Sequence, residues 1–311
     1  MLNVRRHLAP PDLSMEVTEP TPNPHPTASL RAAVRRRTCS SSRVRSTRDC
    51  IMKIPYYQID AFTTKVFSGN PAGVCLLEKW PEDAVLQGIA AENNLSETAY
   101  IVKSGEQYDL RWFTPEMEVD LCGHATLASA FVVFEYIDSA SESISFSSKS
   151  GSLTVTRSGN LLAMDFPSRP AMICQPPDFI TKALGIYPME IRKSVRDYLA
   201  IFDSEEQVRK LQPDMQLLSK FNCLGTIVSA PGMNCDFVSR FFAPQAGIPE
   251  DPVTGSAHST LIPYWAKRLG KRKLHALQVS RRGGELFCEE HGDRVVISGN
   301  AVMFLHGTIS I

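Results

Sequence analysis

Gly123 and His124 stand at the predicted start of a helix, a setting in which a protein can bind an anion and titrate a proton. The residues that follow, 126–136, are nearly all apolar or small, which predicts a helix buried on every side but too short to cross a bilayer. The first N–H groups of a helix lack partners within it, and that end carries roughly half a positive charge. Because glycine lets a ligand approach the backbone closely, the sequence predicts an anion site here.

A second copy of this arrangement lies far downstream. Arg111 is followed by two aromatic residues, one further residue and a proline, and Arg240 begins the same run. Each run leads to an acid-bearing loop and then to a glycine that opens a helix of small apolar residues; the second copy supplies Asp251, Gly255 and Ser256. The recurrence predicts two halves of one architecture, each of which presents a helix N-terminus to a shared cleft. The other interpretation is a coincidence between two unrelated core helices.

Glu97 is a candidate for acid–base chemistry, because a carboxylate held against a substrate can take a proton and return it. It lies between Ser96 and Thr98, at the corner where a predicted helix ends and a strand begins. A glutamate at such a corner is more often a solvated charge. Its position alone therefore leaves both interpretations open.

The eight cysteines form neither a disulfide framework nor a metal-binding pattern. They are scattered, without a C-x-x-C pair and without the histidine spacing of a zinc site. With no secretion signal, they are most simply the reduced thiols of a cytosolic protein. No glycine-rich nucleotide motif follows a predicted strand. The sequence therefore predicts neither a metal site nor a cofactor.

The elements that would position these residues form two domains behind a basic leader. Residues 1–52 carry a formal charge of +5, six prolines and no apolar periodicity, which predicts a disordered segment. Residues 53–166 and 167–311 are the predicted domains, separated by a proline-rich linker, and the last strand can return to the first domain. Besides the two central helices, the pattern predicts helices at 81–92 and 179–184 and strands at 54–60, 73–77, 108–113, 144–146, 153–157, 161–166, 198–202, 226–230, 237–241, 276–280, 285–288, 294–298 and 301–305.

Charge and hydropathy argue against two classes of partner. The chain is neutral overall, because the basic leader offsets a mildly acidic remainder. No aromatic residues interleave the arginines at 35–37, so nucleic-acid binding is not indicated. No apolar run is long enough to predict a membrane partner. We expect a cytoplasmic protein, with organellar targeting by the Arg/Ser-rich leader left open and Met52 as an alternative start.

Several motifs resemble those of the phenazine-biosynthesis-like (PhzF) isomerase family, within the diaminopimelate-epimerase-like superfamily. The resemblance runs from about residue 53 to the C-terminus, and its motifs lie at residues 60–62, 69–71, 94–98, 113–126 and 250–257. It implies an α/β (α+β) fold of two similar domains, each a mixed β-sheet or barrel wrapped around a central helix. That expectation agrees with the repeat found in the residues themselves.

The resemblance also implies an activity and a site. The family's acid–base residue is the glutamate of a Leu-Ser-Glu motif, which is Glu97 here, and its helpers match His124, Asp251 and Ser256. We expect Asn70, Ser96, Gly123 and Gly255 to bind the substrate, the two glycines because each opens a central helix. The implied protein is a homodimeric isomerase without metal or cofactor, which shifts a proton and a double bond in a small unsaturated amino or hydroxy acid. Nothing in the residues shows that phenazines are involved.

Two other functions stay open. A catalytically silent binding or adaptor protein could keep the fold, although it would have no need of a general base. A racemase or epimerase with two thiols needs one cysteine from each half; Cys122 supplies one, but the second repeat has no cysteine between Asp251 and Ser256. The burial of Glu97 separates these functions, because a solvent-facing Glu97 would favour the adaptor.

Overall fold

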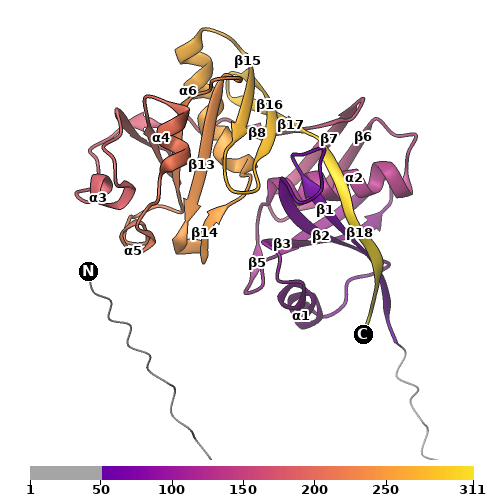
Figure 1. Cartoon of the computed structure of the whole chain (residues 1–311). Coiled ribbons are helices and arrows are strands. Elements are labelled where there is room, and N and C mark those ends of the chain that lie inside the picture. The colour runs from indigo at the N-terminus through magenta and orange to yellow at the C-terminus, as the bar shows by residue number, and fades with distance from the viewer. Residues whose placement is uncertain (1–50) are drawn as a thin grey trace, which may run out of the picture. The chain divides into compact units, whose positions relative to one another are not determined.

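Two buried helices organise residues 51–311, the part of the chain that the computed structural model describes (Figure 1). The first, α2 (Gly123–Val132), has eight buried residues and continues as a π-helical turn over Val133–Ile137. The second, α6 (Gly255–Leu269), has nine buried residues and ends at Gly270, whose positive φ suits a helix stop. Within this range no helix is both long and apolar enough to cross a membrane. The predicted leader lies outside the described residues except for its last two.

Eight strands of the first half surround α2. β1 pairs antiparallel with β2, β2 parallel with β3, β3 antiparallel with β4 and β4 parallel with β6, after which β6, β7 and β8 form an antiparallel run. The short β5 pairs with β4. The strands are β1 (Lys53–Ala61), β2 (Asn70–Leu77), β3 (Glu97–Ser104), β4 (Gln107–Phe113), β5 (Glu118–Val119), β6 (Ser143–Ser148), β7 (Gly151–Ser158) and β8 (Leu161–Pro167).

The second half repeats this pairing strand for strand. β10, β11, β12, β13, β15, β16 and β17 follow one another with the same sequence of antiparallel and parallel neighbours, and β14 takes the place of β5 beside β13. The repeat that the two arginine motifs predict is therefore present in the backbone. These strands are β10 (Glu190–Lys193), β11 (Tyr198–Ile201), β12 (Thr226–Pro231), β13 (Phe237–Ala243), β14 (Ile248–Asp251), β15 (Lys273–Gln278), β16 (Gly284–His291) and β17 (Arg294–Gly299).

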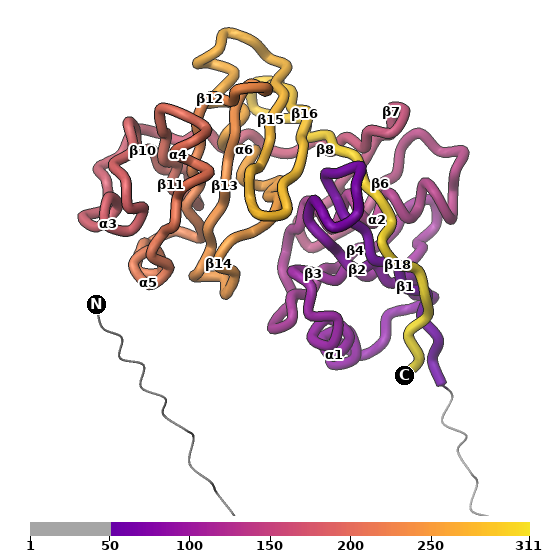
Figure 2. Tube along the Cα trace, viewed as in Figure 1, coloured from indigo at the N-terminus to yellow at the C-terminus, as the bar shows by residue number. Residues whose placement is uncertain are grey.

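The halves join along β8 and β17, which pair antiparallel. The last strand, β18 (Ala301–Ser310), then leaves the second half and lies antiparallel beside β1, so that the end of the described chain meets its beginning (Figures 1 and 2). In the second half, the short β9 (Met172–Ile173) has the corresponding place beside β10. Every strand of residues 51–311 thus belongs to one hydrogen-bonded network of 18 strands.

One hydrophobic core runs through both halves. It contains Leu127 of α2 and Leu261 of α6, together with Phe166 of β8 and Ile297 of β17 from the junction. The outer faces of the sheets carry separate clusters. One lies under α1 (Asp83–Asn93) and the other under the helices α3 (Ile180–Leu184), α4 (Glu205–Lys210) and α5 (Met215–Leu218).

The repeated arginines form the same brace in each half. Arg111 of β4 donates two hydrogen bonds, of 2.7 and 2.9 Å, to the carboxylate of Glu118 in β5. Arg240 of β13 grips Glu250 in β14 with two bonds of the same lengths. A guanidinium and a carboxylate fit each other in this two-point geometry, which fixes orientation as well as distance. The brace holds the hairpin that leads into each central helix.

Several short elements have no periodic signal in the sequence pattern. β5, β9, β10, β14, α4 and α5 have two to six residues each and are too short for periodicity to appear, so they were not predicted. Two of them do carry a cap signal, because the side chains of Ser204 and Asp214 accept backbone N–H groups at the starts of α4 and α5. The last strand also extends to Ser310, five residues beyond its predicted end.

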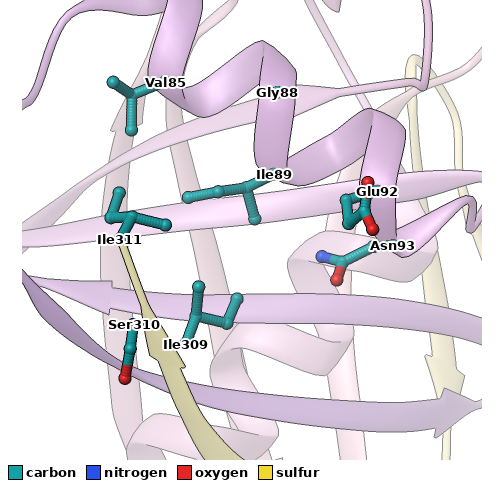
Figure 3. A pocket seen from close by; sticks show the side chains of 8 residues that line it. All are labelled: Val85, Gly88, Ile89, Glu92, Asn93, Ile309, Ser310 and Ile311. Carbon is teal, nitrogen blue, oxygen red and sulfur yellow. The ribbon is translucent and has the colours of Figure 1, made fainter.

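A cavity of about 470 Å³ lies between α1 and the end of β18 (Figure 3). Its lining is mainly apolar, with Val85 and Ile89 of α1 facing Ile309 and Ile311 at the C-terminus. None of the predicted site residues lines it. The predicted residues Gly123, His124, Gly255 and Ser256 lie instead where the two central helices begin.

Candidate active site

Glu97 is the first residue of β3 and follows the turn that ends α1. Its side chain is only 15% exposed, so the corner position is covered and not solvated. Burial raises the pKa of Glu97 to about 8, with the charge of Asp251 acting in the same direction and a hydrogen bond to Cys122 opposing them. A carboxyl group with such a pKa is populated in both protonation states near neutral pH.

His124, the second residue of α2, is buried and faces this carboxyl group. Its Nε2 lies 3.3 Å from Oε2 of Glu97, and its Nδ1 lies 3.4 Å from Sγ of Cys122, the residue before the helix. Burial lowers the pKa of His124 to about 3 and raises that of Cys122 well above its usual range. Glu97 thus has an uncharged imidazole and an uncharged thiol as neighbours, and neither forms an ion pair with it.

Asp251 closes β14 and is held from both halves. Its Oδ1 accepts a 2.7 Å hydrogen bond from the amide of Asn70, and its Oδ2 accepts one of 2.5 Å from the hydroxyl of Thr254. Asn70 begins β2, is fully buried, and also donates to the carbonyl of Val253 at 2.9 Å. Burial raises the pKa of Asp251 to about 6, although these two hydrogen bonds act to lower it. Asn70 therefore ties the first half to the loop that precedes α6.

Ser256, the second residue of α6, has a partner that the sequence analysis missed. Its hydroxyl accepts a 2.8 Å hydrogen bond from Arg196, and Arg196 also pairs with the buried Asp197. The positive charge of Arg196 acts to lower the pKa of Asp251. Arg196 lies in the loop before β11 and belongs to no recognisable motif, so nothing in the sequence pattern could have identified it.

Gln278, at the end of β15, is a second residue that the sequence analysis missed. Its amide nitrogen donates to the carbonyl oxygen of Asp251 and its amide oxygen accepts the N–H of Thr254, both at 2.8 Å. It is almost completely buried. By holding the backbone at both ends of this short loop, Gln278 fixes the approach to α6.

Gly123 and Gly255 bring the starts of the two central helices face to face. A β-carbon placed on either glycine would lie 3.7 Å from the α-carbon of the other. Among residues 51–311, no side chain caps the first turn of either helix. Their leading N–H groups therefore point toward a common region without a side-chain acceptor, which is the arrangement that binds anions.

Three buried polar atoms at this place have no hydrogen-bond partner among the described residues: Oε2 of Glu97, Nε2 of His124 and Oδ1 of Asn70. Buried polar atoms are nearly always paired, so each such exception asks for an explanation. A polar ligand between the helix starts would supply the missing partners.

The structure brings most of the predicted site residues into contact. Glu97 meets His124, Asn70 meets Asp251, and Gly123 meets Gly255. Ser256 contacts the newly found Arg196, while Ser96 is half-buried next to Glu97 in the chain.

Comparisons with known proteins identify the family. Residues 59–307 match the profile of the family described as phenazine biosynthesis-like protein, PhzC-PhzF. The chain belongs to the PhzF family. A curated relative from Pseudomonas aeruginosa, named an uncharacterized isomerase, is 50% identical over 260 residues, which cover 84% of this chain and all of the relative.

Solved structures agree on the fold. The crystal structure of a PhzF-family phenazine biosynthesis protein from Enterococcus faecalis superposes with a TM-score of 0.81 at 50% identity, covering 83% of this chain and 99% of that one. A predicted epimerase from Pseudomonas aeruginosa has a TM-score of 0.63 at 16% identity, covering 82% and 99%. The PhzF family and the mixed α/β, epimerase-like fold predicted from the motifs are confirmed.

Proposed function

We propose that this protein is an isomerase in which Glu97 alone moves a proton between two carbon atoms of a small unsaturated amino or hydroxy acid. The observation that supports it most is the setting of Glu97: a covered carboxyl group, with a pKa raised to about 8, at the start of the central helix of its half. A general acid–base group works best when its pKa is near the working pH. The isomerase names of curated relatives point the same way.

The proton balance needs no second base. Ionised Glu97 removes a proton from one carbon, the electron pair moves to shift the double bond, and the resulting carboxylic acid returns the same proton to another carbon on the same face. Because His124 is uncharged near neutral pH, its role is to donate or accept a hydrogen bond at Nε2. General acid–base transfer contributes about 10²–10⁴ in rate, so holding the substrate in place has to supply the rest.

The helix starts are the proposed holding site for the substrate carboxylate. The unpaired N–H groups in the first turns of α2 and α6, which begin at Gly123 and Gly255, supply hydrogen-bond donors. The dipoles of the two helices supply positive potential. Asp251 and Asn70 then face the other polar groups of the substrate. The amide oxygen of Asn70 has no partner among residues 51–311 and is available for this purpose, and the hydroxyl of Ser256 at the start of α6 is a further candidate.

The same setting weighs against the two alternatives. An adaptor protein has no use for a covered carboxyl group with a raised pKa, because burying it costs stability. A two-thiol racemase needs a second cysteine where the repeat places Thr254, whose hydroxyl is bonded to Asp251. We further propose a homodimer that acts in the cytoplasm on a small anionic substrate, without metal or cofactor.

The test is a deuterium-exchange screen. Small cyclic and acyclic unsaturated amino or hydroxy acids are incubated with the protein in deuterated water, and carbon-bound deuterium is measured by mass spectrometry. Glu97→Gln keeps the size of the side chain but cannot accept a proton, so its exchange rate should fall by on the order of 10³ or more. His124→Asn should lose less, because it orients the substrate without carrying the transferred proton.

The matched control is Glu92→Gln, which neutralises an exposed carboxylate on α1 in the same half of the protein. This variant should exchange at the parent rate. If Glu97→Gln exchanges as fast as the parent on an acid that the parent turns over, Glu97 is not the base and the proposal fails.

A further inference from the structure

Cys122, His124 and Glu97 form a cluster that the sequence spacing did not reveal. One ligand atom from each residue, a thiol sulfur, an imidazole nitrogen and a carboxylate oxygen, lies within 4.8 Å of the other two. Cys122 and His124 are two residues apart, while Glu97 comes from a different strand, so no linear zinc motif exists. The three side chains meet only because β3 begins beside the start of α2.

The distance between the Glu97 oxygen and the His124 nitrogen is that of two neighbouring ligands around a tetrahedral zinc ion. Zinc bonds of about 2.0–2.3 Å place neighbouring nitrogen and oxygen ligands about 3.3 Å apart and sulfur and nitrogen about 3.6 Å apart. Here Nε2 of His124 lies 3.3 Å from Oε2 of Glu97, and Sγ of Cys122 lies 3.4 Å from Nδ1 of the same ring. An imidazole nitrogen binds one metal along its own lone pair, so only one of these contacts includes the metal-binding nitrogen.

The buried atoms without a hydrogen-bond partner indicate that Nε2 is the metal-binding nitrogen of His124. Nε2 of His124 and Oε2 of Glu97 face each other, both are buried, and neither has a hydrogen-bond partner among residues 51–311. The His124 side chain is only 6% exposed. A cation between these two atoms would satisfy both, and Cys122 would become the third ligand once its sulfur moves from the Nδ1 side of the ring toward the ion.

We propose that Glu97, Cys122 and His124 form a binding site for a thiophilic divalent cation of the zinc class. Thiolate, imidazole and carboxylate are the ligands that such an ion prefers, and three protein ligands leave a fourth position for water. Thiolate and carboxylate together would neutralise the charge of the ion inside the protein. Cys122 must lose its proton on binding, so the affinity falls as the pH is lowered.

The ion would act as a reversible inhibitor, a consequence that rests on the proposed function. A cation on Oε2 of Glu97 blocks the carboxylate that is proposed to take the substrate proton. The cluster would therefore make a metal-independent isomerase sensitive to zinc.

Cobalt(II) is the probe for binding, because a thiolate bound to cobalt gives a charge-transfer band in the near ultraviolet. Titration of the full chain with cobalt should produce this band with one ion per chain, and zinc should abolish it by competition. Cys122→Ser should lose the band. His124→Asn should keep the thiol but weaken cobalt binding by more than the roughly 10–100-fold that loss of an outer-shell partner costs, since a ligand itself is gone.

Cys235→Ser is the matched control, because it removes a half-buried thiol of the second half that belongs to no such cluster. Its band should equal that of the parent. In a second measurement, zinc should raise the melting temperature of the parent and of Cys235→Ser but not of Cys122→Ser. Absence of the band in the parent, or a band that persists in Cys122→Ser, overturns the metal site.

Exchange assays separate this proposal from the proposed function. Zinc should stop deuterium exchange at the concentration at which it displaces cobalt, and a chelator should restore it. If cobalt binds through Cys122 but zinc leaves exchange intact, the metal site stands and the role of Glu97 as the base fails. If exchange depends on Glu97 but no band forms, the function stands and the metal site fails.

Discussion

The two halves of this protein share a framework but differ in the chemistry they carry. Each has the same order of paired strands, the same arginine–glutamate brace and the same buried helix that begins with glycine. Even the contact of the fourth helical residue is repeated. Thr126 donates to the carbonyl of Cys122 at 2.6 Å, and Nδ1 of His258 lies 2.8 Å from the carbonyl of Thr254.

The position of the proposed base shows the difference most sharply. Thr98 lies opposite Phe113 in the first half and Thr226 opposite Phe242 in the second, which makes Gly225 the counterpart of Glu97. A β-carbon on Gly225 would come within 2.3 Å of the Phe241 ring. The second half has therefore no room for a base at this position unless that ring moves.

The helix starts differ in a complementary way. The first half presents Cys122 and His124, both uncharged, whereas the second presents Thr254 and Ser256, which are bonded to Asp251 and Arg196. In the proposed function the first half thus supplies the base, and the second supplies most of the polar network that would hold the substrate. A repeated framework can support single-base chemistry because its two copies have diverged at a few equivalent positions.

The largest predicted effect is the pH dependence created by this divergence. The pKa of Glu97 is raised from 4.5 to about 8. Between these values the folded protein holds a proton that the unfolded chain has released, so the free energy of unfolding decreases as the pH rises. At 1.36 kcal/mol per pKa unit the full decrease is about 3–5 kcal/mol.

Urea unfolding at intervals from pH 4 to pH 9 measures this decrease without any substrate. Glu97→Gln removes the titrating group, so its stability should vary less with pH and exceed that of the parent at pH 9. Exchange activity should follow the ionised form and fall about tenfold per pH unit below about 8. If the free energy of unfolding of the parent and of Glu97→Gln depended equally on pH, the first half would not perturb the pKa of this carboxyl group. Glu97 would then differ from its counterpart Gly225 in side chain but not in environment.

A smaller effect tests whether both halves bind the substrate carboxylate. A β-carbon alone fits at Gly255, but the two γ-carbons of Gly255→Val would fill the gap toward Gly123. We expect binding of an acid from the exchange screen to weaken about tenfold, or 1.4 kcal/mol, by calorimetry. Gly123→Val should behave alike, whereas Gly88→Val is the control, because a β-carbon at that position meets nothing within 4 Å. If only one of the two variants bound the acid more weakly, the substrate carboxylate would be assigned to the helix start of that half.

The sequence predicted the long helices and strands and the two-fold repeat of the molecule. The two central helices and most strands follow from apolar patterning, and the arginine motifs indicated the repeat before any contact was known. The family motifs singled out Glu97, although its position alone left open whether it was catalytic or an ordinary solvated charge. Its burial depends on α2 and β14, elements that lie far from it in the sequence.

The parts that could not be predicted arise from contacts between distant segments. Arg196 reaches Ser256 across 60 residues, and Gln278 holds a loop that begins 27 residues before it. Neither residue belongs to a motif, because a hydrogen bond made through the fold constrains no local spacing. The cluster of Cys122 with Glu97 was not predicted for the same reason.

The last prediction concerns the brace, the feature in which the halves look most alike. Arg111 pairs with Glu118 and the exposed Asp83, so solvent weakens part of its contribution. Arg240 is 12% exposed and also donates to the carbonyls of Val208 and Leu211.

Lysine cannot reproduce the two-point grip in either half. Arg240→Lys also leaves buried carbonyls unpaired, so it should cost about 2–3 kcal/mol against about 1 kcal/mol for Arg111→Lys. Urea unfolding at pH 7 measures both, with Arg281→Lys as a control on an exposed arginine outside the brace. Equal losses would mean that the carbonyl contacts of Arg240 add nothing, and that the two braces match in energy as well as in geometry.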